Sequence, residues 1–104
     1  MKYLSYVFIV LALYTSSSAY AADNTVEIKD YMYVPASLTV HIGETVTWIN
    51  RDQIPHTIIE SNNVFRSAAL DTNDKYTYTF KTTGTYTYFC SLHPQMTATV
   101  VVKP

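Results

Sequence analysis

Three side chains that can bind a metal ion fall within residues 90–96, in the segment CSLHPQM near the C-terminus. Cys90 offers a thiolate, His93 an imidazole and Met96 a thioether, and the spacing C-x-x-H-x-x-M places all three close together. His56 is a fourth candidate from a separate part of the chain. Cys90 is also the only cysteine in 104 residues. Because it cannot form an internal disulfide, a ligating or reactive role is the simplest explanation for it.

One thiolate, two imidazoles and one thioether form the donor set of a blue-copper electron-transfer site, with the two His and the Cys close to a plane and a weak axial Met. The thiolate and the thioether are soft ligands, and imidazole accepts both oxidation states of copper. Such a set favours neither square-planar Cu(II) nor linear Cu(I), so the ion changes charge with little rearrangement. We therefore predict a Cu(II)/Cu(I) site at His56, Cys90, His93 and Met96.

The same residue types are compatible with different roles. Zinc also binds sulfur and nitrogen ligands, although a thioether favours copper. Cys90 alone is compatible with a buried apolar cysteine, Met96 with a core residue and His93 with an exposed loop residue. A cysteine enzyme would need an accessible thiolate beside an oxyanion hole. Because Cys90 ends a strand in a domain too small for a substrate cleft, we expect no enzymatic activity.

The elements that must position these ligands are strands. From Thr25 onward apolar and polar residues alternate, which is the period of a β-strand and not of a helix. The alternating apolar residues are Val26 and Ile28; Leu38, Val40 and Ile42; Val46 and Trp48; Tyr76, Tyr78 and Phe80; Tyr86, Tyr88 and Cys90; and Ala98, Val100 and Val102. Turn residues separate these runs, so the pattern predicts an all-β sandwich or barrel of seven or eight strands. Residues 61–70 are expected to form a loop with one helical turn, and residues 91–95 a tight loop before a strand that begins at Thr97.

The N-terminus predicts export. Lys2 precedes an apolar run over residues 3–14, and Ala19-Tyr20-Ala21 fits an A-x-A cleavage site. This pattern is typical of a secretory signal peptide, and the apolar run is shorter than the roughly 20 residues that cross a bilayer. We expect residues 1–21 to be removed and residues 22–104 to form one domain without a membrane span. The periplasm is the expected location, with secretion as the second choice.

Two segments resemble the cupredoxins, which are small blue copper proteins. They are IKDYMYVPASLTVHIGETVTWINRDQIPHTI at residues 28–58 and GTYTYFCSLHPQM at residues 84–96. Within the plastocyanin and pseudoazurin group, the compact ligand spacing is most similar to that of amicyanin. The resemblance implies a Greek-key β-sandwich that holds one type 1 copper ion through His56, Cys90, His93 and axial Met96. It also implies a hydrogen-bonding role for Asn50.

The resemblance further implies a soluble, monomeric electron carrier with redox proteins as partners. The expected donor is a periplasmic dehydrogenase and the expected acceptor a c-type cytochrome or an oxidase. Leu92, Pro94, Ile54 and Pro55 are expected to form an apolar docking surface, because brief contacts use small interfaces. With 7 basic and 8 acidic residues and no run of one sign, the chain is not typical of nucleic-acid-binding proteins. The alternative function is a copper-binding or delivery protein without electron-carrier turnover.

One position departs from the family pattern. Leu92 stands where amicyanin and plastocyanin have proline, so its backbone keeps an N–H group. A hydrogen bond from that N–H to the Cys90 sulfur would favour Cu(I). On this condition we expect Leu92→Pro to lower the reduction potential.

Overall fold

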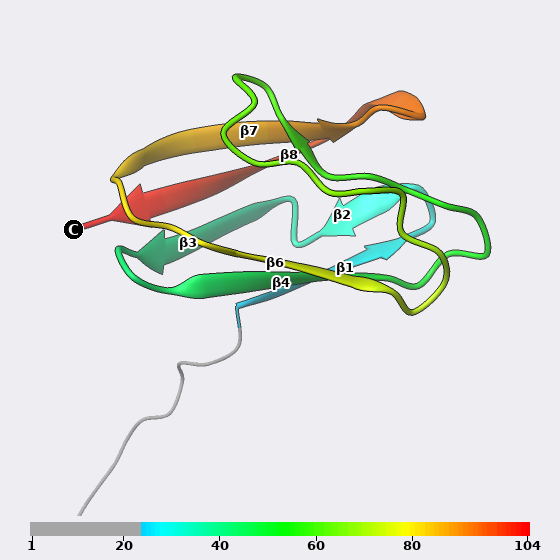
Figure 1. The fold of residues 1–104 in the computed structure, drawn as a ribbon, viewed down its shortest axis with the longest axis horizontal. Helices are drawn as coiled ribbons and strands as arrows, with labels where there is room; N and C mark the ends of the chain where they lie inside the picture. The colour runs from blue at the N-terminus through cyan, green and yellow to red at the C-terminus, as the bar shows by residue number, and fades with distance from the viewer. Residues whose placement is uncertain (1–23) are drawn as a thin grey trace, which may run out of the picture.

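The computed structural model describes residues 24–104, so the predicted signal peptide lies outside the described residues. Within them the chain forms eight β-strands and no helix, and therefore no helix long and apolar enough to span a membrane. The strands build two four-stranded sheets, which Figure 1 shows as two layers with β7 and β8 in one and β4 and β6 in the other. The predicted all-β sandwich is thus confirmed.

The chain crosses between the two sheets several times. The first sheet has the order β2 (Met32–Val34), β1 (Thr25–Lys29), β4 (Thr45–Asn50) and β6 (Lys75–Thr79). The second has the order β3 (Ser37–His41), β8 (His93–Lys103), β7 (Gly84–Cys90) and β5 (Ile59–Glu60). β1 pairs with β4, and β3 with β8, in parallel, whereas the other pairs are antiparallel. Segments far apart in the sequence therefore meet at the same end of the sandwich.

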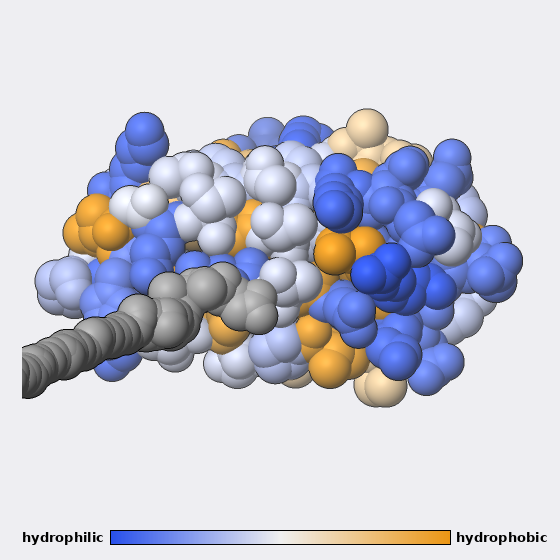
Figure 2. All heavy atoms as spheres, turned by 90° about the horizontal axis from the view of Figure 1, so that it is seen from below, coloured by the Kyte–Doolittle hydropathy of each residue, from blue (hydrophilic) through white to orange (hydrophobic). Residues whose placement is uncertain are grey.

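The core lies between the sheets and follows the predicted alternation. The inward residues of β1, β4 and β8 are buried. Three large side chains are fully buried, namely Trp48 in β4, Phe80 just after β6 and Tyr88 in β7. Burying a large apolar side chain contributes about 1.5–3 kcal/mol each, so these positions hold the two layers together. Ile42 is an exception, because β3 ends at His41 and Ile42 is 46% exposed. Seen from the β4 and β6 side, the outer face is mostly hydrophilic (Figure 2).

Residues 61–70 form a loop, as expected, but contain no helical turn. Phe65 from this loop is buried, and its ring lies 5.7 Å from that of Trp48. Isolated bridges join Ile59 to Arg66 and His56 to Leu70. The loop therefore closes one edge of the core and supports the segment that carries His56.

The β7–β8 hairpin is tighter than predicted. The connecting turn is Ser91-Leu92 alone, Cys90 pairs with His93, and β8 already begins at His93. The prediction of a loop over residues 91–95 was wrong because Pro94 looked like a strand breaker. Proline is tolerated near the start of a strand and at a bulge, and the ladder shifts register between Phe89 and Cys90, beside Pro94.

Candidate metal centre

Three of the four predicted ligands converge at the end of the sandwich where β7 meets β8. Cys90 Sγ lies 3.7 Å from His56 Nδ1 and 3.6 Å from His93 Nδ1, and the three ligand atoms all lie within 4.8 Å of one another. Metal bonds of about 2.0 Å to nitrogen and about 2.3 Å to sulfur allow one ion to bridge atoms up to about 4.3 Å apart. The sulfur-to-nitrogen distances therefore fit a single metal ion.

The hairpin register explains why Cys90 and His93 meet. They are opposite each other across β7 and β8, and side chains of such cross-strand neighbours lie about 5 Å apart at Cβ. His56 comes from the segment between β4 and β5. Its backbone pairs with that of Leu70 through two hydrogen bonds. The site therefore joins two parts of the chain that are 34 residues apart.

Burial differs among the ligands in a way that matters for function. Cys90 and His56 are fully buried, whereas His93 is only partly buried. A cysteine nucleophile needs an accessible thiolate, and Cys90 offers a sulfur that faces two imidazoles inside the core. His93 is the ligand that reaches toward solvent.

Asp52 fixes the orientation of His56. His56 Nε2 lies 2.7 Å from Asp52 Oδ2. Because a carboxylate accepts hydrogen bonds, Nε2 carries the proton and the lone pair of Nδ1 faces Cys90 Sγ. A carboxylate that holds a metal-binding histidine in this way is a common feature of metal sites.

The same carboxylate accepts backbone hydrogen bonds from two residues of the β1–β2 turn, Asp30 at 2.7 Å and Tyr31 at 3.0 Å. Burial raises the pKa of Asp52, but the hydrogen bonds from Tyr31, His56 and Asp30 outweigh burial and hold the pKa below its usual value. Asp52 therefore stays ionised beside His56. Nothing in the sequence indicated this role, because Asp52 lies four residues before His56 in a stretch where the sequence predicts no helix to bring the two side chains together.

Thr57 donates to the cysteine sulfur. Its backbone N–H lies 3.4 Å from Cys90 Sγ and its hydroxyl 3.8 Å. In the described part of the chain no hydrogen bond joins Leu92 to that sulfur. The expected lowering of the reduction potential by Leu92→Pro required a hydrogen bond from the Leu92 N–H to the sulfur, and this bond is not formed. The donor to the sulfur is Thr57, the residue after His56.

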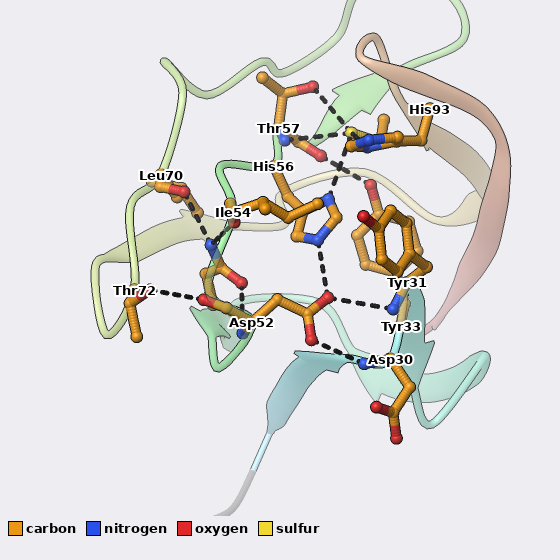
Figure 3. A network of polar contacts seen from close by, with 12 residues as sticks. Asp30, Tyr31, Tyr33, Asp52, Ile54, His56, Thr57, Leu70, Thr72 and His93 are labelled. Carbon is orange, nitrogen blue, oxygen red and sulfur yellow. Dashed lines mark hydrogen bonds and ion pairs between the residues drawn. The ribbon is translucent and has the colours of Figure 1, made fainter.

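Asn50 holds the loop that leads to His56. It is fully buried, and its Nδ2 donates to the carbonyls of Ile54 and Leu70, both at 2.8 Å. Its Oδ1 accepts the backbone N–H of Asp52 at 2.9 Å. The expected hydrogen-bonding role of Asn50 is present, and Figure 3 shows its partners Ile54, Leu70 and Asp52 beside His56.

Comparison with known proteins identifies the family. The chain matches the model of the cupredoxin-like domain over residues 4–102. It belongs to the cupredoxins. It is 38% identical over 94 residues to amicyanin from Paracoccus denitrificans, an alignment that covers 84% of this chain and 72% of the relative.

Solved structures agree with this assignment. A novel purple cupredoxin from Nitrosopumilus maritimus superposes with a TM-score of 0.74 at 34% identity, over 78% of this chain and 100% of the other. The Cu(I) form of an amicyanin mutant gives a TM-score of 0.73 at 35% identity, over 81% of this chain and 87% of the other. Together with the sulfur and nitrogen donor set, these likenesses confirm an amicyanin-like cupredoxin with one type 1 copper ion as its cofactor.

Met96 lies near the other ligands in this cupredoxin. It is 6% exposed and belongs to the same buried cluster as Cys90. A cavity of about 210 Å³ borders it, with Tyr31 and Tyr33 among the other lining residues. A buried thioether beside two imidazoles and a thiolate fits the axial position, and its ligand role stays a prediction.

The four predicted docking residues flank the histidines in the chain. Leu92 is 52% exposed, Pro94 and Pro55 are exposed, and Ile54 is half-buried. Leu92 and Pro94 stand on either side of His93, the ligand that reaches toward solvent. Their use as a docking surface stays a prediction.

Proposed function

We propose that this cupredoxin carries single electrons between redox proteins and that His56, Cys90, His93 and Met96 hold its copper ion. The bound ion supplies the chemistry by alternating between Cu(II) and Cu(I). The observation that carries the proposal is the buried Cys90 sulfur with an imidazole Nδ1 on each side, at 3.6 and 3.7 Å. This is the donor set of an electron-transfer site and not of a site that must bind a substrate.

The chain's own residues keep this set fixed. Asp52 holds His56 in the tautomer that presents Nδ1 to the site. The backbone N–H of Thr57 stabilises negative charge on the Cys90 sulfur and so favours the reduced state. Because the ligands come from a rigid sandwich, little has to move when the charge changes.

Electrons would enter and leave at His93, because it is the partly exposed ligand. The apolar residues Leu92 and Pro94 on either side of it, with Ile54 and Pro55, suit brief docking, since a small apolar interface forms and separates quickly. We infer that the mature monomer, residues 22–104, works in the periplasm. Its donor would be a dehydrogenase and its acceptor a c-type cytochrome or an oxidase.

An optical spectrum of the copper-loaded, oxidised protein tests the proposal. We expect an intense visible band from the Cys90 thiolate and Cu(II), and its complete loss in Cys90→Ser. His41→Ala is the control and should keep the band. The side chain of His41 is 67% exposed, and its backbone pairs with Lys103, at the opposite end of β8 from His93. Stoichiometric copper binding without a visible band would refute the proposed site.

Voltammetry and copper exchange separate a carrier from a delivery protein. A carrier gives a reversible one-electron wave and retains copper when an apo acceptor protein is added. Rapid loss of copper to the acceptor, without a reversible wave, would instead support copper delivery. With a c-type cytochrome as acceptor, Leu92→Asp should slow electron transfer while leaving the potential nearly unchanged.

A further inference from the structure

Tyr31 contacts both histidines of the site without being a ligand. Its ring centroid lies 5.5 Å from that of His56 and 4.9 Å from that of His93, with interplanar angles of 83° and 82°. Figure 3 shows the ring beside the two imidazoles, on the side of the β1–β2 turn. Tyr31 is 51% exposed, so burial in the core does not explain its position.

The backbone of Tyr31 is in an unfavourable conformation. Asp30 and Tyr31 both have positive φ, 53° and 61°, and form the two-residue turn between β1 and β2. Such turns favour Asn and Gly, because a bulky residue at positive φ is uncommon. Strained residues persist where the surroundings determine their conformation, and they cluster at functional sites. The turn therefore places a large ring against the histidines at a conformational cost.

Asp52 supplies the surroundings that hold this turn. Its Oδ1 accepts the N–H of Asp30, and its Oδ2 accepts both the N–H of Tyr31 and the proton on His56 Nε2. The side chain of Asp52 is only 13% exposed. One carboxylate thus fixes His56 directly, and fixes the residue whose ring packs on His56 and His93.

We propose that Tyr31 is a positioning residue of the metal site. Asp52 holds its backbone, and the ring of Tyr31 restrains the imidazole of His93 and slows the release of copper. The proposal rests on the proposed function for the identity of the metal. His93 needs such restraint more than His56, because it is partly exposed and follows a turn of only two residues. Rotation of its ring would turn Nδ1 away from Cys90 and open the site to water. An edge-to-face contact changes such an equilibrium by a factor of about 2 to 10.

Two substitutions separate the ring from the rest of the side chain. Tyr31→Phe keeps the ring and removes only the hydroxyl. Tyr31→Asn removes the ring but suits positive φ, since asparagine tolerates the left-handed conformation. Met32→Ala is the matched control, because Met32 follows Tyr31, is 55% exposed and lines the same cavity, but has no aromatic ring to pack on the histidines.

The first measurement is the rate at which the reduced holoprotein loses copper to an excess of a Cu(I)-specific chelator. We expect Tyr31→Asn to release copper about tenfold faster than the wild type, and Tyr31→Phe and Met32→Ala to stay within about twofold. Urea titrations of the same variants show whether a change in release merely follows a change in stability.

The second measurement needs no metal. NMR relaxation of the His93 imidazole in the apoprotein should show a more mobile ring in Tyr31→Asn and an unchanged ring in Tyr31→Phe. Wild-type release and wild-type ring mobility in Tyr31→Asn would overturn the proposal, as would equal effects of Tyr31→Asn and Tyr31→Phe. If the wild type showed no visible copper band, the proposed function would fail, whereas the apoprotein measurement would still decide the role of Tyr31.

Discussion

Asn50→Ala is the most informative test of how the loop before His56 is held. The change removes two hydrogen bonds from Nδ2, to the carbonyls of Ile54 and Leu70, and one from the N–H of Asp52 to Oδ1. Asn50 is fully buried, so water does not simply replace the amide. We expect a lower free energy of unfolding and a less ordered loop.

The loss of stability in Asn50→Ala depends on which hydrogen bonds each partner of Asn50 retains. The Leu70 carbonyl still accepts the N–H of His56 at 3.1 Å, so its loss is that of an ordinary hydrogen bond, about 1 kcal/mol. The Ile54 carbonyl and the Asp52 N–H lose a part-buried partner, which costs about 1 kcal/mol or more each. The total is about 3 kcal/mol, a large share of the roughly 5–15 kcal/mol that stabilises a typical domain.

Urea unfolding of the apoprotein, followed by the fluorescence of Trp48, measures this loss without a contribution from metal binding. Asn62→Ala is the matched control, because residue 62 is exposed and its hydrogen bond to Glu60 uses the backbone N–H. We expect the control to change stability by less than about 0.5 kcal/mol.

Asn50→Asp adds a second variant of the same shape. A carboxylate cannot donate to the carbonyls of Ile54 and Leu70, so we expect a loss at least as large as in Asn50→Ala. If Asn50→Ala lowered the free energy of unfolding by less than about 1 kcal/mol, or no more than Asn62→Ala, the reasoning about this network would be refuted.

Four further outcomes follow from the core and the site. The hydroxyl of Tyr88 is buried without a hydrogen-bond partner in the described part of the chain, so Tyr88→Phe should raise the free energy of unfolding by about 1 kcal/mol in urea titrations. Burial raises the pKa of Tyr88 to about 12 from its usual 10, and the Trp48 indole N–H, which is near the hydroxyl but not in hydrogen-bonding geometry, lowers the pKa only slightly. As the pH rises, the Tyr88 hydroxyl therefore loses its proton in the unfolded chain before it does so in the folded protein. The free energy of unfolding should fall between about pH 10 and pH 12, and should fall less in Tyr88→Phe. The same dependence of the free energy of unfolding on pH in both proteins would contradict this. Removing copper should lower the free energy of unfolding by about 2.7 kcal/mol relative to protein with free copper at 100 times Kd, and equal urea midpoints would show that the folded state does not bind copper preferentially. Leu92→Pro should leave the potential nearly unchanged by voltammetry, since the sulfur takes its hydrogen bond from Thr57.

The strands and the core were predictable from the sequence because both depend on local pattern. Alternation places every second residue on one face of a strand, so Trp48, Tyr88 and Cys90 could be assigned to the interior before any strand was paired. The end of β3 was less predictable, since alternation continued through Ile42 while the chain turned at Gly43, where φ is 93°. Periodicity shows which face a residue takes but not where the pairing stops.

The candidate ligands could also be named from the sequence, because Cys90, His93 and Met96 are few residues apart and of unusual type. The structure brings Cys90 and His93 together with His56, and the ligand role of Met96 stays a prediction. Apart from Asn50, whose hydrogen-bonding role the resemblance implied, the groups that hold the ligands were decided by tertiary structure. Asp52 meets Asp30 across 22 residues, and Thr57 meets Cys90 across 33. Such contacts arise from the register and packing of separate strands, which no short stretch of sequence encodes. The sequence thus determined which atoms can bind copper, and the pairing of the sheets decided which neighbours orient them.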